Sequence, residues 1–324
     1  MASEIEVPAA AESLAWGTSP VLYLSYGMVT SRGVRPAQTG AVAAAPSFTV
    51  LSPPMGLDYF AVFDGHRHLG AATTATAGVR LLERLGDAIA GQVHGELLSA
   101  NPRFAGMSHD VARWWRTVLQ EAYHAVDVLV ASSVGEGVSA TALVALVLEN
   151  YVVVANSGGS KAVLCRGGEH VELTHHENRM QRPSGYVLPD RLSCMHAPRR
   201  RCLALTWLLS GSATSSVDEE VVVDVVTVAW DARDEFLILG GGEFWSGVTP
   251  ASACAFVRRR LAGTTSRITW GSPAFALELA RLAGCAGRHR NVSVAVILLK
   301  NLWARPVSRF TTKQAKRSAA EAGH

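Results

Sequence analysis

A succession of short apolar segments between Ser139 and Leu173 constrains the fold of this chain more than any other feature. Polar or glycine-containing turns separate the segments, and this pattern is typical of β-hairpins that follow one another. Sequential hairpins form an antiparallel meander rather than a parallel sheet. The strands that the pattern predicts cover residues 143–148, 151–154, 161–165 and 171–173.

Helices and further strands flank this meander. Further strands are predicted at 21–26, 47–51, 59–66, 221–228, 236–239 and 291–299, and helices at 69–90, 108–131, 250–263 and 273–284. Residues 37–46 are predicted to be a loop. Ser108, Thr249 and Ser272 are the expected helix N-caps, and a proline follows the last two. Paired helices beside antiparallel strands predict an α+β fold in which two antiparallel β-sheets pack as a sandwich flanked by helix pairs.

Composition places this fold in one domain. The chain has 324 residues, and its hydrophobic fraction of 48% is enough for a large core. Residues 1–20 are predicted to be a flexible N-terminal segment, 21–303 the folded domain, and 304–324 a basic, disordered tail. A net charge of +3 with scattered basic residues does not indicate nucleic-acid binding.

The cysteines and the N-terminus bear on the compartment. The five cysteines are widely spaced and form no C-x-x-C pair, so neither a disulfide framework nor a thiolate zinc site is expected. A reducing compartment fits this usage. The acidic start argues against a secretory signal, and the apolar runs are too short to span a bilayer. The chain is therefore expected to be cytoplasmic, nuclear or both, with no membrane partner.

The stretch from Tyr59 to His66 combines an alternating apolar run with an Asp-Gly turn. The alternation predicts a half-buried strand, and the turn ends it at Asp64 and Gly65. A carboxylate at the end of a sheet strand is a usual place for a metal or catalytic group. The alternative is that Asp-Gly closes this strand for conformational reasons alone.

Four stretches taken together resemble the metal-dependent serine/threonine protein phosphatases of type 2C, especially the plant members. They are FAVFDGH (60–66), VVANSGGSKAVL (153–164), DEFLILGGGEFW (234–245) and RNVSV (290–294). Their order and spacing agree with the family from about residue 21 to residue 300. The resemblance implies the same sandwich fold, and it implies chemistry in which two Mn²⁺ or Mg²⁺ ions activate a bridging water.

Position by position, the resemblance implies that most of the metal-binding carboxylates have been lost. Arg35 matches the arginine that grips phosphate, and Asp64 and Gly65 match the residues that supply a bridging carboxylate and a carbonyl. The family's other acidic positions fall on Thr39, Gly40, Gly159, Gly242, Ser246 and Arg290. Arg290 would put a positive charge where a cation should sit, and we hypothesise that it pairs with Asp64 instead.

These losses predict a catalytically inactive pseudophosphatase that acts by binding phosphoproteins or kinases of a signalling pathway, with no cofactor. The alternative is an active Mn- or Mg-dependent serine/threonine phosphatase with unusual ligands. Two other ligand sets are conceivable: one in which His66, His68 and His289 join Asp64 around a transition metal, and one in which Glu243 substitutes for Gly242.

Other polar and aromatic clusters have simpler interpretations. The arginine runs at 199–201 and 258–260 would suit an acidic partner or a nuclear address, but a solvated surface is the expected role. The pair His175-His176 is expected in an exposed loop. The pair Trp114-Trp115 is expected to pack in or beside the core rather than to form a ligand platform.

Overall fold

The computed structural model of the chain describes residues 12–18, 25–32, 39–50, 56–66, 75–97, 108–133, 139–148, 150–174, 223–263, 274–286 and 291–299. The strands are β1 (Glu12–Thr18), β2 (Ser25–Ser31), β3 (Gly40–Val50), β4 (Gly56–His66), β5 (Ser139–Leu148), β6 (Tyr151–Ser157), β7 (Lys161–Arg166), β8 (Glu169–Glu172), β9 (Asp224–Ala229), β10 (Asp234–Gly240) and β11 (Val292–Leu298). The helices are α1 (Ala75–Leu97), α2 (His109–Ser133), α3 (Gly242–Trp245), α4 (Pro250–Gly263) and α5 (Ala274–Ala286).

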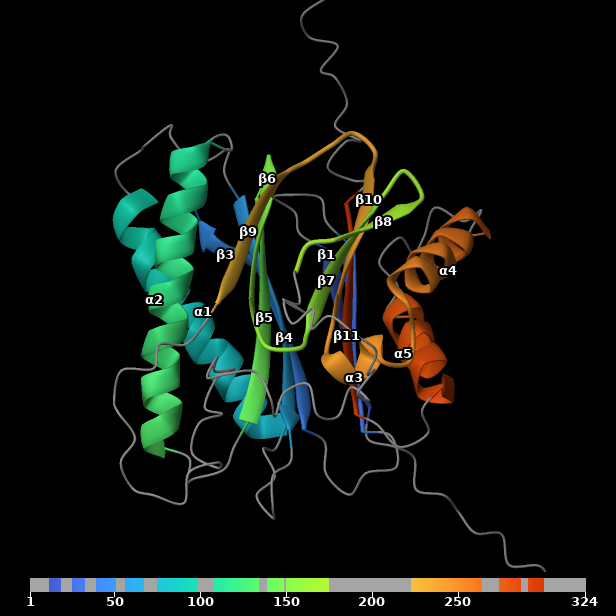
Figure 1. The fold of residues 1–324 in the computed structure, drawn as a ribbon, viewed down its shortest axis with the longest axis horizontal. Helices are drawn as coiled ribbons and strands as arrows, with labels where there is room; N and C mark the ends of the chain where they lie inside the picture. Colours follow the sequence, from blue (N-terminus) through green and yellow to red (C-terminus); the bar gives the residue numbers. More distant parts are fainter. Residues whose placement is uncertain are drawn as a thin grey trace, which may run out of the picture.

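The described strands form two antiparallel sheets. Sheet A has the order β1-β2-β11-β10-β7-β8, and sheet B has the order β3-β4-β5-β6-β9. The two sheets face one another, with α1 and α2 outside sheet B and α4 and α5 outside sheet A (Figure 1). The structure therefore confirms the α+β sandwich flanked by helix pairs.

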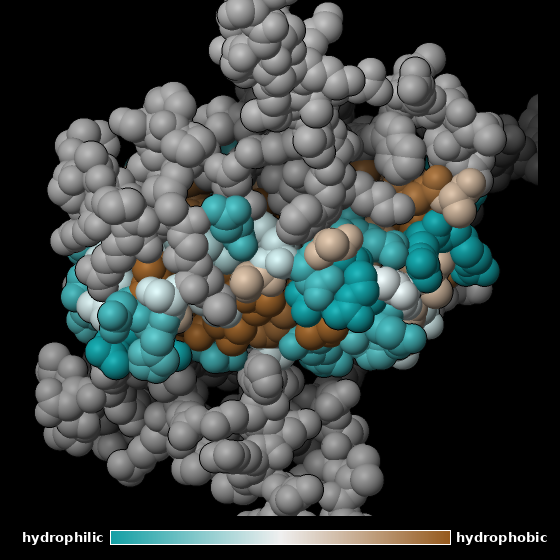
Figure 2. All heavy atoms as spheres, turned by 90° about the horizontal axis from the view of Figure 1, so that it is seen from above, coloured by the Kyte–Doolittle hydropathy of each residue, from teal (hydrophilic) through white to brown (hydrophobic). Residues whose placement is uncertain are grey.

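Three hydrophobic layers hold these elements together. One layer lies between the two sheets, and the other two lie between each sheet and its helix pair. Seen from above, hydrophilic residues lie on the two helical sides and a hydrophobic band runs between them (Figure 2). Among the residues that the structure describes, no helix has the length and apolar character needed to cross a membrane.

Strand β4 belongs to sheet B, so one of its faces lies toward sheet A and the other toward the helix pair α1 and α2. Its residues Phe60 and Val62 belong to the layer between the sheets, whereas Tyr59, Ala61 and Phe63 face α1 and α2. The prediction of a half-buried strand is therefore wrong, because the helix pair covers the second face. Alternate residues of β4 are instead buried in two different hydrophobic layers, one on each face of the sheet.

The helix signals in the sequence correspond to observed contacts. The Ser108 hydroxyl accepts a hydrogen bond from the Val111 N–H at 3.2 Å, and the Thr249 hydroxyl accepts one from the Ser252 N–H at 3.2 Å. Both N-caps are thus confirmed, and α4 begins at Pro250 as expected. Trp115 is buried and Trp114 packs against the same core, which confirms the packing interpretation of this pair.

Two segments that were expected to be irregular contain strands. β1 lies within the N-terminal segment predicted to be flexible, and it pairs with β2 from Glu12↔Ser31 to Thr18↔Ser25. β3 begins at Gly40, inside the predicted loop, and pairs with β4. Its alanine-rich sequence has a weak strand propensity, and pairing with the apolar β4 outweighs that propensity.

Candidate functional site

Asp64 lies near the end of β4, where the candidate site was expected. It is 3% exposed, and it pairs with Gly40 of β3 on one side and with Thr141 of β5 on the other. The Gly65 N–H donates to the Thr39 carbonyl oxygen at 3.1 Å, which fixes the end of the strand. The structure therefore brings four of the sequence-predicted positions, Thr39, Gly40, Asp64 and Gly65, to one end of sheet B.

The short helix α3 lies directly against the Asp64 carboxylate. A Cβ atom added at Gly241 would lie 2.9 Å from Asp64 Oδ2, so only glycine fits this approach without a shift. The Glu243 N–H donates to the same oxygen at 3.5 Å, a long hydrogen bond. Protein backbone thus occupies the space on this side of the carboxylate.

The space beside the start of β3 is filled in a similar way by residues at the start of β11. A Cβ atom added at Gly40 would overlap the Ser293 hydroxyl. The Asn291 side-chain amide donates to the Thr39 hydroxyl at 2.7 Å, and the Gly241 N–H donates to the Ser293 carbonyl oxygen at 3.0 Å. Asn291 and Ser293 were not among the predicted site residues, although both belong to the RNVSV stretch that carried the resemblance.

Gly159 and Gly242 also meet at this end of the sandwich. A Cβ atom added at Gly242 would lie 3.3 Å from the Gly159 carbonyl oxygen. The Trp245 indole N–H, one turn further along α3, donates to the Lys161 carbonyl oxygen at 3.0 Å. Two chain segments that the resemblance expects to carry metal ligands are therefore in direct backbone contact.

Several predicted site residues are not placed with this group. Ser246 is exposed, and its hydroxyl donates to the Glu243 carbonyl oxygen at 2.8 Å. Arg35, His68, His175, His176, His289 and Arg290 lie outside the described residues, and for His66 only the backbone is described. The Arg290–Asp64 pair and the histidine ligand set therefore stay predictions.

The described residues do not fit a pair of divalent metal ions. Such ions need several oxygen ligands, most of them carboxylates. Asp64 supplies a carboxylate, whereas Gly40, Gly159 and Gly242 have no side chain, and Thr39 is hydrogen-bonded to Asn291. Within the described ranges, no group of three histidine, cysteine, aspartate or glutamate residues is arranged to hold a metal.

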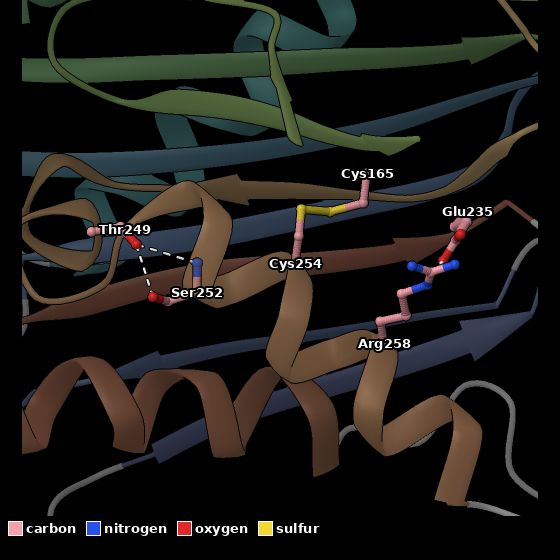
Figure 3. The surroundings of a disulfide bond; sticks show 6 residues. All are labelled: Cys165, Glu235, Thr249, Ser252, Cys254 and Arg258. Atoms are coloured by element: carbon pink, nitrogen blue, oxygen red, sulfur yellow. Dashed lines mark hydrogen bonds and ion pairs between the residues drawn. A yellow bond between two sulfur atoms is a disulfide. The ribbon is translucent and has the colours of Figure 1, made fainter. Parts of the chain in front are cut away.

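A disulfide bond joins sheet A to its outer helix layer. Cys165 of β7 is bonded to Cys254 of α4, with a Cα–Cα distance of 5.8 Å (Figure 3). The wide spacing of the cysteines predicted no disulfide framework, and this prediction is wrong for Cys165 and Cys254. The two residues are 89 positions apart, and only the packing of α4 on sheet A brings them together.

The arginine run of α4 takes part in intramolecular ion pairs. Arg258 lies 3.3 Å from the Glu235 carboxylate, and Arg260 lies 2.8 Å from the Glu278 carboxylate. Arg260 also lies over the Phe256 ring. Two of the three arginines are thus engaged within the chain, which agrees with a solvated helix surface. The second run, at 199–201, lies outside the described residues.

Comparisons with known proteins agree with this fold and with these motifs. The family model "Protein phosphatase 2C" matches residues 24–183. In Oryza sativa subsp. japonica, "Probable protein phosphatase 2C 68" is 30% identical over 75% of this chain and 68% of its own length. "Probable protein phosphatase 2C 30" of the same species is also 30% identical over 75% of this chain, which spans 61% of that relative.

Solved structures show the same architecture. Serine-threonine phosphatase 2C from Toxoplasma gondii has a TM-score of 0.60 and 15% identity, and the alignment covers 88% of this chain and 99% of the other. The catalytic domain of the phosphatase PstP, in complex with two manganese ions, has a TM-score of 0.53 and 18% identity over 85% and 97% of the two chains. The chain belongs to the protein phosphatase 2C family.

Proposed function

We propose that this family member is catalytically inactive and acts by binding proteins. The contact between Gly40 and Ser293 carries the proposal. The resemblance expects a metal-binding carboxylate at position 40, but a Cβ atom there would overlap the Ser293 hydroxyl. The position lacks the ligand, and the Ser293 hydroxyl would have to turn away before a side chain could lie there.

The charge of the site supports the same conclusion. Two divalent cations carry four positive charges, and the family balances them with several carboxylates. Of the described positions that match family ligands, Asp64 alone is acidic, since Thr39, Gly40, Gly159 and Gly242 are neutral. A single carboxylate and the Gly65 carbonyl are too few hard ligands to displace the hydration shell of two such ions.

Hydrogen bonds within the chain stabilise the site in place of metal coordination. Thr39 bonds to Asn291, and the Asp64 carboxylate accepts the Glu243 N–H. Thr141 of β5 and Ser160, which precedes β7, share a buried hydrogen bond of 2.8 Å between their hydroxyls. Because these contacts connect β3, β4, β11 and α3 directly, the fold at this end needs no bound ion.

The proposed partners are phosphoproteins or the kinases that phosphorylate them. The support is membership of a family whose relatives are named as protein phosphatases. Arg35 is proposed to contact a phosphate group weakly, without metal ions beside it. No cofactor is proposed for this role.

The alternative function is that of an active serine/threonine phosphatase that uses Mn²⁺ or Mg²⁺ with unusual ligands. The names of the plant relatives and the manganese-bound PstP domain favour it. In that case Asp64 and Gly65 would hold the metal, together with residues that the resemblance does not identify. Glu243 is the candidate nearest to Asp64 along α3.

A phosphopeptide assay with Mn²⁺ or Mg²⁺ distinguishes the two functions. We expect no turnover above buffer from the full chain and no heat of Mn²⁺ binding by titration calorimetry. Asp64→Asn should behave like the native chain in both measurements. Metal-dependent turnover that this variant abolishes would overturn the proposal and establish the alternative.

A second experiment tests binding. The full chain is titrated with a set of phosphopeptides and their unphosphorylated counterparts, and Arg35→Ala is the matched variant. We expect a measurable preference for the phosphorylated form that Arg35→Ala removes. Equal affinity for both forms would overturn the assignment of Arg35 to phosphate.

A further inference from the structure

We propose that the Cys165–Cys254 disulfide is a reversible redox staple that controls how firmly α4, and with it the neighbouring α3, is held against sheet A. The inference stands whether or not the chain is catalytic. Cysteine usage predicts a reducing compartment, and in such compartments a disulfide is usually transient or redox-sensing rather than permanent.

The two cysteines are placed so that the bond can form and break without rebuilding the fold. Their Cα atoms are 5.8 Å apart, within the range of ordinary disulfides. Cys165 is 1% exposed and Cys254 is 3% exposed. Because a reductant cannot reach buried sulfur atoms directly, reduction requires a transient displacement of α4 from sheet A.

The disulfide and an ion pair both tie α4 to sheet A. Cys254 and Arg258 are one turn apart on the side of α4 that faces the strands, and Arg258 reaches Glu235 of β10 (Figure 3). Arg258 also fills the space beside Gly168, in the turn between β7 and β8. Without the disulfide, α4 would be held by this ion pair and by hydrophobic packing.

The staple joins the two chain segments that meet at the candidate site. Gly159 lies just before β7, which carries Cys165, and Gly242 begins α3, which precedes the α4 residue Cys254. Near the site the same segments are held by the Trp245–Lys161 hydrogen bond and by the approach of Gly242 to the Gly159 carbonyl. Breaking the disulfide would remove one of the contacts that hold these two segments together. The remaining contacts lie near Gly241, which approaches the Asp64 carboxylate.

The redox step is a thiol–disulfide exchange with a dithiol reductant. One thiolate of the reductant attacks a sulfur atom of the pair, forms a mixed disulfide and releases the other cysteine as a thiolate, which takes up a proton. The second thiol of the reductant then displaces the remaining cysteine and closes the reductant's own disulfide. Two electrons pass to the protein, and glutathione disulfide reverses the reaction by the same two steps.

Differential thiol alkylation and mass spectrometry of the full chain test whether the bond exists and is reversible. We expect the Cys165–Cys254 pair in protein isolated without reductant, its loss in native buffer with dithiothreitol, and its return with glutathione disulfide. Cys285→Ser, which alters a cysteine outside the pair, should leave this cycle unchanged. A pair that never forms, or one that is reduced only after unfolding, would overturn the proposal.

Hydrogen exchange of the same oxidised and reduced samples tests the structural consequence. We expect amides of α3 and α4 to exchange at least about tenfold faster after reduction, while those of α2 are unchanged. Cys254→Ser should match the reduced native chain. Equal exchange in both redox states would overturn the proposal. No step depends on phosphatase activity or phosphopeptide binding, so failure here is distinct from failure of the proposed function.

Discussion

The hydroxyl of Ser293 overlaps the position that a Cβ atom at residue 40 would take. Glycine is the residue that fits there without a shift. Gly40 begins β3 and Ser293 lies in β11, so the contact crosses from sheet B to sheet A. It fills the space beside position 40, where the resemblance to the phosphatase family predicts a metal ligand.

Gly40→Ala should therefore lower the free energy of unfolding by about 1–3 kcal/mol, the usual cost of overpacking. Ser293→Ala removes the overlapping oxygen, and the Ser293 Cβ would lie at an ordinary distance of 3.4 Å. The double variant should recover most of the loss in a urea-unfolding double-mutant cycle. Additive losses from the two changes would contradict this contact.

Two glycines of α1 should respond to alanine in opposite directions. A Cβ atom at Gly78 would lie 2.5 Å from the Phe63 ring, whereas one at Gly91 would have nothing within 4 Å. Gly91→Ala should raise the free energy of unfolding by about 0.5–1 kcal/mol, because alanine favours a helix. Gly78→Ala should lower it by about 1–3 kcal/mol, because overlap with Phe63 outweighs that preference. Thermal unfolding measures both, and a stabilised Gly78→Ala would refute the packing.

Two ion pairs near the β9–β10 turn differ in burial and should differ in strength. The Asp234 side chain is fully buried and accepts two hydrogen bonds from Arg166, at 2.6 and 3.1 Å. This pairing raises the pKa of Arg166. Arg166→Met should cost about 3–5 kcal/mol, since it leaves a buried carboxylate without its cation.

The matched control is Arg233→Met in the exposed pair with Asp231. Hydrogen bonds from Arg233 hold the pKa of Asp231 below its usual range, but the carboxylate is open to solvent, so the expected loss of stability is much smaller than for Arg166→Met. Urea unfolding of both variants at one salt concentration gives the comparison. Equal losses would show that burial does not set the strength of these pairs.

Alkaline pH should unfold the chain through three buried tyrosines. Burial raises the pKa of Tyr151 to about 12 and raises those of Tyr59 and Tyr123 as well. The Tyr59 hydroxyl donates to the Leu82 carbonyl oxygen, and that of Tyr151 accepts the Trp115 indole N–H. The pKa of an unfolded tyrosine is near 10, and the folded-state values of these three are higher. The stability that these tyrosines contribute is therefore complete below about pH 10, and it is lost as the pH rises toward 12 and above.

Each of these tyrosines should contribute up to about 1.4 kcal/mol of lost stability per pH unit in that window. Tyrosinate absorbance and circular dichroism recorded during one alkaline titration check the prediction. We expect the absorbance of the buried tyrosines to rise together with the loss of structure. Their ionisation in a chain that stays folded would contradict the burial that the structure describes.

Much of the fold could be predicted from local patterns. The hairpins from β5 to β8, the capped start of α4 and the faces of α1 and α2 depend on neighbouring residues, whose periodicity is visible in the sequence. Even there, Val79 is exposed although it stands at helical spacing from the buried Leu82 and Leu85, because the face that packs is narrower than the pattern. β1 and the first part of β3 could not be predicted, because their stability comes from partner strands rather than from their own propensity.

The candidate site also combines features that the sequence predicts with features that it does not. The sequence by itself indicated the family and predicted the loss of acidic ligands at Gly40, Gly159 and Gly242, because residue identity within a motif requires no coordinates. Only the tertiary structure decided what fills the space: the Ser293 hydroxyl against Gly40, the backbone of α3 against Asp64, and the bond between Cys165 and Cys254. These contacts join residues far apart in the chain, and they exist because two sheets and their helices pack together.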